Sequence, residues 1–311
     1  MLKIIRYIFF TLVILLAGVF IWAYRSDIAV EQLKTRYAPP PSEFVSIQGM
    51  QVHYREEGKG FPLVLIHGTG ASLHTWQGWV DQLKQHYRVI RFDLPAFGLT
   101  GPHPQHDYKI STYVKFVQAL LQKKGIKKCH IAGNSLGGNI AWRFALAYPD
   151  RVGKMILLDA SGIPLKKKRK KLWIMQLART PIVNWVMRYA TPRAIFRKNL
   201  LEVYSDDAKV SPALITQYQQ LTLRKGNREA FIQRAKTPVE DRSEDIPRIN
   251  THTLIMWGKD DAWIPLELAY AFKEKLPNNQ LIIYPNVGHV PMEEIPLKTA
   301  QDALHFLEAK P

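Results

Sequence analysis

The stretch CHIAGNSLGGNIAWRFALAYPD, residues 129–150, decides how the chain folds. Its apolar start predicts a buried strand, and its alanine-rich second half predicts a helix. Between them lies GNSLG, residues 133–137, which matches the G-x-S-x-G pattern of a sharp strand-to-helix turn. Such a turn presents the serine hydroxyl outward, and it needs glycines because side chains there would collide with the neighbouring strand and helix. We therefore interpret Ser135 as a nucleophile rather than as part of a plain glycine-rich turn.

Short apolar runs recur on both sides of this turn and alternate with helical segments. Besides the strand before the turn, strands are predicted at residues 43–48, 51–57, 62–68, 87–95, 154–160, 251–258 and 279–285. The first two of these read as a hairpin, and the continuous apolar runs are typical of strands buried on both faces of a parallel sheet. Strands that alternate with helices predict an α/β fold built on a doubly wound, mostly parallel sheet.

The alternation stops between residues 163 and 245, where the spacing is helical and no strand is evident. We interpret this segment as a helical cap inserted between two parts of the core, residues 42–162 and 246–311. Open α/β sheets place their functional sites at the carboxyl ends of the strands. The cap is therefore expected to cover the site.

The N-terminus predicts a membrane anchor. Residues 7–24 carry no charge, and a helix of this length spans about 27 Å, close to the hydrocarbon core of a bilayer. A cleaved signal peptide would have a shorter apolar region and a small-x-small cleavage site, which this stretch lacks. We therefore expect an uncleaved anchor in residues 1–41, with residues 25–41 forming a polar stalk stiffened by prolines.

Positive charge is nearly equal on the two sides of the anchor, so the positive-inside rule does not orient it. A short N-terminal anchor ahead of a large domain usually translocates that domain. We expect an extracytoplasmic domain on a single-pass anchor, on the periplasmic side in a bacterium.

A serine nucleophile needs a base and an acid, in the chain order Ser, acid, His for this kind of turn. Three histidines follow the serine, and only His289 lies in a loop directly after a predicted strand; His252 starts a strand and His305 lies in a helical stretch. Asp260 and Asp261 both follow the strand at 251–258. We choose Asp261 as the acid, with Asp260 as the alternative.

The negative oxygen of a tetrahedral intermediate needs N–H donors, each worth about 3–4 kcal/mol of barrier. The residue after the nucleophile, Leu136, supplies one backbone N–H. The second is expected from Thr69 in HGTG, residues 67–70, because this loop follows an earlier strand. His67 is then a structural residue.

HGTG, DLPAFGLT, GNSLGG, WGKDD and VGHVPMEE stand in the order and approximate spacing found in the α/β-hydrolase superfamily. The resemblance covers nearly everything from residue 44 to 311 except the insertion, which resembles that family's variable cap. The apolar N-terminus, GNSLGG and GHVPM together resemble lipases and esterases of the membrane-anchored monoacylglycerol-lipase type. GNS-x-GG also resembles carbon–carbon bond hydrolases that act on ring-cleavage products. A serine at the turn argues against dehalogenase and epoxide-hydrolase chemistry, which uses a carboxylate nucleophile in this family.

The formal net charge of the chain is +17, and residues 163–245 contribute +10 of it, from 18 Lys and Arg against 8 Asp and Glu. The densest run is KKKRKK, residues 166–171, followed by an apolar segment containing Trp173 and Trp185. This pattern fits either a solvated charge run before a core-facing helix or a cap that rests on anionic lipid. No nucleic-acid module is recognisable, so we do not expect nucleic-acid binding.

The leading hypothesis is a membrane-anchored serine hydrolase that cleaves carboxylic esters, with lipophilic acyl groups favoured. Ser135, Asp261 and His289 form the expected triad, and no metal or organic cofactor is expected. The alternatives are a carbon–carbon bond hydrolase on the same triad and a non-catalytic ligand-binding protein. The single Cys129 excludes an intramolecular disulfide and a cysteine-rich zinc site.

Overall fold

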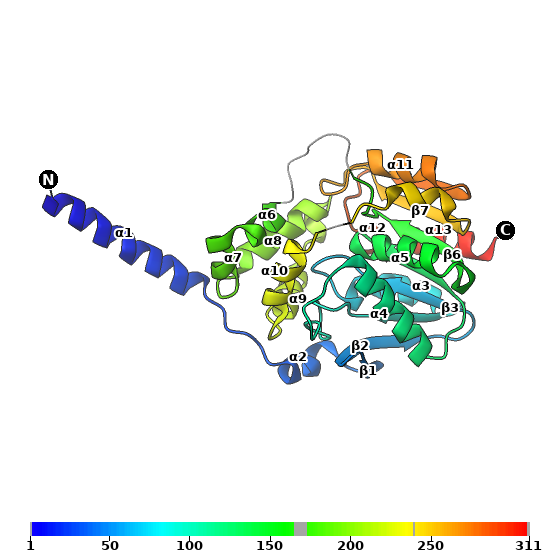
Figure 1. The fold of residues 1–311 in the computed structure, drawn as a ribbon, viewed down its shortest axis with the longest axis horizontal. Helices are drawn as coiled ribbons and strands as arrows, with labels where there is room; N and C mark the ends of the chain where they lie inside the picture. Colours follow the sequence, from blue (N-terminus) through cyan, green and yellow to red (C-terminus); the bar gives the residue numbers. More distant parts are fainter. Residues whose placement is uncertain (1, 165–172, 239, 310–311) are drawn as a thin grey trace.

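The computed structural model describes residues 2–164, 173–238 and 240–309. An eight-stranded sheet in the order β1-β2-β4-β3-β5-β6-β7-β8 forms its centre (Figure 1). The strands are β1 (Ser42–Ile47), β2 (Met50–Glu57), β3 (Pro62–Ile66), β4 (Arg88–Phe92), β5 (Cys129–Asn134), β6 (Val152–Leu158), β7 (His252–Gly258) and β8 (Asn279–Tyr284). β2 pairs antiparallel with β1 and β4, and all later pairs are parallel. The predicted α/β fold is confirmed, and each predicted run overlaps one strand.

Helices cover both faces of the sheet because successive strand residues point to opposite sides. In β5, Ile131 belongs to one buried apolar cluster and Ala132 to the other. The core helices are α3 (Gln77–Leu83), α4 (Ile110–Lys123), α5 (Leu136–Ala147), α11 (Glu267–Lys275), α12 (Pro291–Glu294) and α13 (Pro296–Glu308). The short 3-10 helices are η1 (Leu73–Trp76), η2 (Pro149–Arg151), η3 (Asp207–Lys209) and η4 (Ser243–Arg248).

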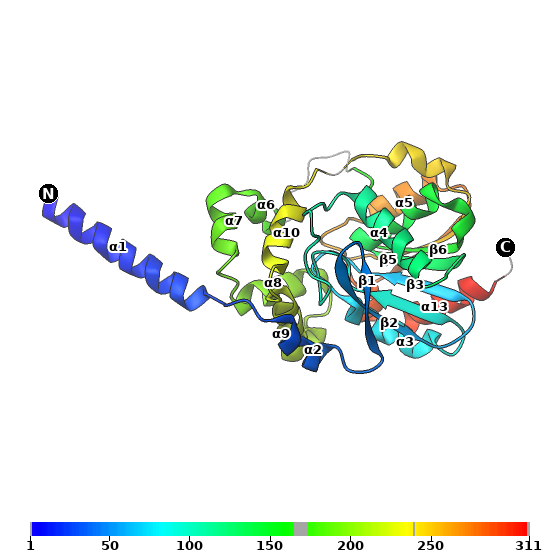
Figure 2. The same cartoon turned by 60° about the horizontal axis from the view of Figure 1, so that its bottom comes forward.

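The described part of the predicted cap contains η3, the start of η4 and five α-helices, and no strand belongs to it there. The α-helices are α6 (Trp173–Arg179), α7 (Pro181–Met187), α8 (Arg193–Val203), α9 (Pro212–Thr222) and α10 (Asn227–Lys236). Figure 2 shows them gathered beside the sheet and helices of the core. The basic run at 166–171, on which the lipid hypothesis partly rests, lies outside the described residues.

The N-terminal helix α1 (Leu2–Ala23) extends away from the rest of the molecule (Figure 1, dark blue). The most apolar 18-residue window of this 22-residue helix has a mean hydropathy of 2.5, and none of that window is buried. By length and composition it is the one helix among the described residues that could cross a membrane, a property that signal sequences share. The structure therefore agrees with an anchor without excluding a signal sequence.

The segment expected to be a polar stalk is instead packed on the molecule. It forms α2 (Val30–Tyr37), in which Leu33 and Tyr37 are buried against Leu99 and Leu221. Leu33 and Tyr37 are four residues apart and therefore share one face of the helix. The proline-based interpretation overlooked this spacing.

Candidate active site

Ser135 stands at the corner between β5 and α5. Its backbone has φ of 56° and ψ of −114°, a strained conformation for a residue with a side chain. Its N–H donates to the Leu158 carbonyl at 3.0 Å, and its own carbonyl accepts from the Asn139 and Ser161 N–H groups at 3.1 Å each. Backbone bonds to β6 and the following loop thus hold the corner, and the side chain lines a pocket.

The glycines around Ser135 are required by close packing, as the sequence predicts. A Cβ on Gly133 would lie 2.2 Å from the Gly137 carbonyl oxygen, and one on Gly137 would lie 2.1 Å from the Ile66 carbonyl oxygen. Both contacts are with backbone, which cannot move aside cheaply. Any side chain at either position would therefore push α5 away from the sheet.

His289 and Asp261 meet near this corner. The imidazole Nδ1 lies 2.7 Å from Asp261 Oδ2, and both side chains are buried. The other carboxylate oxygen accepts from the N–H groups of Trp263 and Ile264 at 2.7 and 2.9 Å. These bonds fix the carboxylate, and a hydrogen on Nδ1 leaves Nε2 free to accept a proton.

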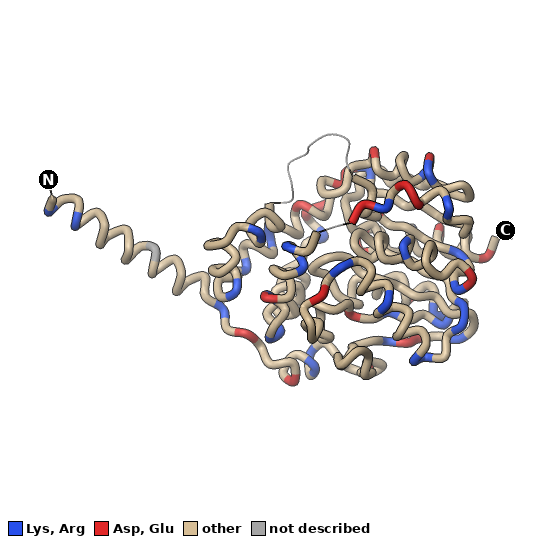
Figure 3. Tube along the Cα trace, in the orientation of Figure 1, with Lys and Arg blue, Asp and Glu red and all other residues tan. Residues whose placement is uncertain are grey.

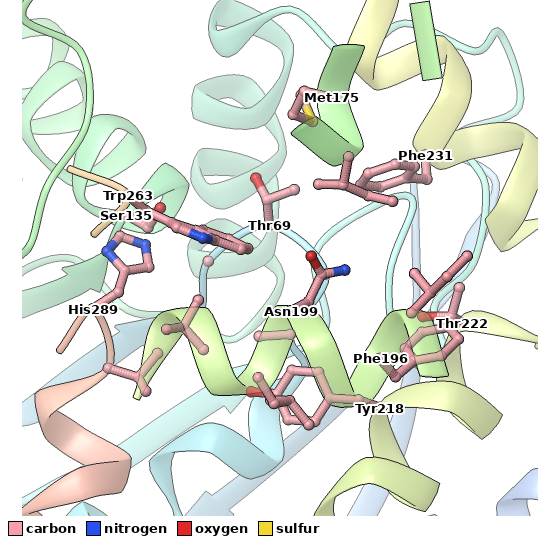
Figure 4. Close-up of a pocket in the computed structure, with 18 of the residues that line it drawn as sticks. Thr69, Ser135, Met175, Phe196, Asn199, Tyr218, Thr222, Phe231, Trp263 and His289 are labelled. Carbon is pink, nitrogen blue, oxygen red and sulfur yellow. The ribbon is translucent and has the colours of Figure 1, made fainter. Parts of the chain in front are cut away.

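His289 is also tied to the serine corner. The side-chain amide of Asn134, the residue before Ser135, donates to the His289 carbonyl at 3.0 Å. Ser135 and His289 line the same pocket and lie together at one end of it (Figure 4). Their side chains make no hydrogen bond to each other in the described structure, and catalytic contacts commonly tighten only when substrate is bound.

Asp260 faces away from this group. Its side chain is exposed and accepts from the Ser205 hydroxyl at 3.4 Å. Of the two adjacent aspartates, the structure therefore brings Asp261 to the histidine and leaves Asp260 at the surface.

The loop predicted to supply the second N–H donor lies against the serine. A Cβ on Gly68 would stand 3.1 Å from Ser135 Cβ, and Thr69 lines the pocket. Leu136 is the first residue of α5, and the first N–H groups of a helix have no partner within it. His67 is fully buried between the Gly68 carbonyl and the Leu94 N–H, and burial lowers its pKa, which suits the structural role expected for it.

Asp159, directly after β6, is a second buried acid beside Asp261, and the sequence interpretation missed it. Its Oδ1 accepts from the Gly258 N–H at 2.9 Å, while its Oδ2 is buried without a partner among the described residues. Burial first, and then the neighbouring charge of Asp261, raise the pKa of Asp159 well above its usual range. A protonated Asp159 fits this position, because a protonated carboxyl group can donate a hydrogen bond from the oxygen that otherwise has no partner.

Asp159, Asp261 and His289 are also the described residues whose ligand atoms could hold a metal, all within 4.8 Å of one another. The direct contact between Asp261 and His289 occupies the space between two of those atoms. The group therefore fits a hydrogen-bonded carboxylate–imidazole pair better than a metal site.

The pocket that ends at Ser135 has a volume of about 190 Å³ and is roofed by the cap. Its walls are mostly apolar, with lining residues that include Ile174, Met175, Met187, Ile195, Phe196, Leu200, Phe231 and Trp263. Figure 4 shows Phe196, Tyr218 and Thr222 at the end away from the serine. The pocket is therefore suited to an extended apolar group whose reacting carbon lies near Ser135.

Among the described lining residues, Arg228 is the one cation, and its guanidinium is already bound. It donates to Asp27 at 2.6 Å and 3.2 Å, to the Arg25 carbonyl at 2.8 Å and to the Thr191 hydroxyl at 3.3 Å. The described wall therefore offers little positive charge to an anionic substrate.

A family model for the alpha/beta hydrolase fold matches residues 62–296. Because the match covers most of the chain, this protein belongs to the α/β-hydrolase fold family.

Individual relatives include several kinds of hydrolase. The chain is 28% identical over 252 residues to 2-hydroxy-6-oxo-2,4-heptadienoate hydrolase of Pseudomonas putida, covering 78% of this chain and 87% of that protein. It is 28% identical over 265 residues to Lipase 3 of a Moraxella species, covering 79% and 77%. A solved structure of a membrane phospholipase A, described as a bacterial virulence factor, has a TM-score of 0.75 at 26% identity and covers 97% of this chain and 98% of that one.

Proposed function

We propose that this protein is a membrane-anchored serine hydrolase that cleaves carboxylic esters with lipophilic acyl groups. Ser135 Oγ attacks the ester carbonyl carbon while His289 takes the hydroxyl proton. Asp261 holds the imidazole and stabilises its positive charge. The N–H groups of Thr69 and Leu136 stabilise the negative oxygen of the tetrahedral intermediate.

The intermediate collapses when the carbon–oxygen bond to the alcohol breaks and His289 returns the proton to the leaving oxygen. An acyl group then remains on Ser135. Water attacks that acyl group with His289 again as base, and the carboxylic acid leaves. The cycle requires no metal or organic cofactor.

One observation carries this proposal: an apolar pocket is lined by Ser135 and by His289, which is paired with Asp261. An acyl chain can lie along the apolar wall while the ester group reaches the serine. A charged substrate would lose hydration in such a pocket without gaining an ion pair.

Carbon–carbon bond hydrolysis is the second candidate, and the dienoate hydrolase relative favours it. A dienoate carries a carboxylate, which a protein site usually recognises with a free cation. The described pocket wall offers only Arg228, which is bound to Asp27. We therefore place ester hydrolysis first.

We further propose that α1 anchors the protein in a membrane, with the hydrolase domain on the extracytoplasmic side. Support comes from the length and hydropathy of α1 and from the membrane phospholipase A structure, which matches nearly the whole chain. Lipid contact by the basic cap would add to this anchoring.

The proposal is tested by labelling the purified full-length protein with a fluorophosphonate probe. Wild type is expected to be labelled and Ser135→Ala to stay unlabelled, with esterase turnover reduced by about six orders of magnitude. p-Nitrophenyl esters of increasing chain length should be preferred over a 2-hydroxy-6-oxo-dienoate. Preference for the dienoate would favour the second candidate, and a labelled, active Ser135→Ala variant would refute both.

A further inference from the structure

We propose that one face of α7 is seated in the membrane interface beside α1 and passes lipid substrate from the bilayer to the pocket. The proposal rests on the anchoring and ester hydrolysis proposed above. It begins with three large side chains, Ile182, Trp185 and Tyr189, whose exposed fractions are 80%, 55% and 40%. Ile182 and Trp185 are three residues apart and share one face of α7. Tyr189 lies in the turn after α7, and its ring packs against Trp185. Few soluble surfaces carry such a patch without a partner.

The chain holds this face next to the end of α1. Tyr24, directly after α1, forms an antiparallel bridge with Ala190, and the Arg25 N–H donates to the Tyr189 carbonyl at 2.8 Å. Both views of the ribbon place α7 on the side of the cap nearest α1 (Figures 1 and 2). Where α1 leaves a bilayer, the α7 face must therefore meet its surface.

The residues at this junction are those that favour a membrane interface. Trp22 and Tyr24 are exposed at the end of α1, and Trp185 and Tyr189 pack edge to face with ring centroids 5.6 Å apart. Aromatic side chains with one polar atom concentrate at the headgroup level. Arg25 adds a cation there, and Figure 3 shows further basic positions where α1 meets the cap.

The two tryptophans singled out in the sequence have different environments. Trp173 donates to Glu202 at 2.9 Å and lies under Lys198 Nζ, 4.4 Å from its ring centroid, so it is held within the cap. Trp185 points outward. The lipid-facing surface is therefore α7 itself and not the whole apolar segment after the basic run.

A bilayer is the occupant that fits, because one partner must cover α7 and α1 together. The apolar window of α1 is entirely exposed in the monomer, and the α7 patch continues from its end. Insertion of an apolar helix face by about 5–10 Å into the interface is typical of such segments.

The opposite side of α7 faces the pocket. Met187 at the end of α7 and Thr191 just after it line the pocket, together with Ile174 and Met175 of α6. One helix thickness of about 10 Å therefore separates the lipid face from the pocket wall. An acyl chain that leaves the bilayer beside α7 enters the pocket without crossing open water.

The first test places a fluorophore on each side of the molecule in full-length protein. Ile182→Cys is labelled with an environment-sensitive dye; the native Cys129 is buried and does not compete. Leu297→Cys, in α13 and 54% exposed, is the matched control. In vesicles of phosphatidylcholine and phosphatidylglycerol, the dye at 182 should shift to the blue and be quenched by lipid-borne quenchers. The dye at 297 should remain in water.

The proposal is overturned if the dye at 182 behaves as the dye at 297 does. It is also overturned if the blue shift develops with protein concentration in detergent alone, which would indicate a second copy of this chain on α7. Both readouts are independent of catalysis, so they remain decisive even if the protein hydrolyses no ester.

The second test measures delivery of substrate. Ile182→Asp/Trp185→Asp is compared with Leu297→Asp, because none of these residues lines the pocket. Hydrolysis of soluble p-nitrophenyl butyrate should match wild type in both variants. Hydrolysis of a long-chain ester in vesicles should fall about tenfold in the α7 variant only. Equal rates on vesicles, or an equal loss on both substrates, would refute delivery through α7.

Discussion

Asp159 is buried beside the Asp261–His289 pair, and its raised pKa has a consequence for stability. In the unfolded chain an aspartate ionises near pH 4, whereas in the folded protein Asp159 keeps its proton well above that pH. Folding therefore takes up a proton at pH values between the unfolded and the folded pKa of this group. The contribution of this group to stability is fully present below about pH 4 and falls as pH rises toward the raised pKa.

Asp159→Asn should remove this pH dependence, because an amide keeps the shape of a protonated carboxyl group and does not ionise. Above about pH 4 and up to the raised pKa, the free energy of unfolding of wild type should fall faster than that of the variant, by up to about 1.4 kcal/mol per pH unit. Urea denaturation at several pH values measures both slopes. Asp150→Asn, an exposed acid, is the control. Identical slopes in wild type and Asp159→Asn would show that Asp159 is ionised in the folded protein.

A second experiment distinguishes the roles of Asp260 and Asp261. Asp261→Asn should lower kcat on p-nitrophenyl butyrate by about 10⁴, because the amide cannot orient and stabilise the imidazolium. Asp260→Asn should leave kcat unchanged, since its side chain is bound only to Ser205 at the surface. The opposite ranking would make Asp260 the triad acid.

At the scale of elements, the segment between α1 and α2 is bound to the cap. Ile28 donates to the Leu223 carbonyl at 2.8 Å and accepts from the Lys225 N–H at 2.9 Å. Asp27 pairs with Arg228 at 2.6 Å. These contacts bind the short connection to the cap, so it is not a free linker.

Asp27→Asn should weaken this junction by leaving the buried Arg228 without its carboxylate. Because Asp27 is 39% exposed and partly screened by solvent, the loss in unfolding free energy should be about 1 kcal/mol. Urea denaturation of the full-length protein in detergent measures it. Asp150→Asn serves as the control here as well, and equal stability of the two variants would contradict the ion pair's contribution.

The sheet and the strand-to-helix corner at Ser135 could be predicted because their signals are local. Apolar runs mark strands buried on both faces, and the crowded backbone at Gly133 and Gly137 permits no side chain, so the glycines are visible in the sequence. The position of Asp261 against His289 also agrees with the expected loop placement.

Other features could not be predicted because their causes lie far away in the chain. The partner of Asp27 is 201 residues distant, so nothing near Asp27 indicated this ion pair. Asp159 reads as an ordinary residue after a strand until β7 brings Asp261 beside it. Exposure of the α7 face likewise depends on which side of the helix packs on the cap.

For the whole molecule, α1 contributes apolar surface, and among its described side chains only Ala23, its last residue, is buried. A chain lacking residues 2–22 should therefore keep its thermal unfolding midpoint and its rate on p-nitrophenyl butyrate, measured against full-length protein in detergent. It should move from the membrane to the soluble fraction, and through its basic cap it should retain more binding to anionic than to neutral vesicles. A large drop in the midpoint would mean that α1 packs on the domain.

The bridge between Tyr24 and Ala190 also bears on how the chain is made. The ribosome produces α1 first, yet the groups that bind residues 24–28 belong to a part of the chain that emerges much later. Closing so long a loop is slow compared with forming local helices. Throughout most of synthesis residues 24–28 have no native neighbours, and their docking is among the last steps by which the newborn protein acquires its shape.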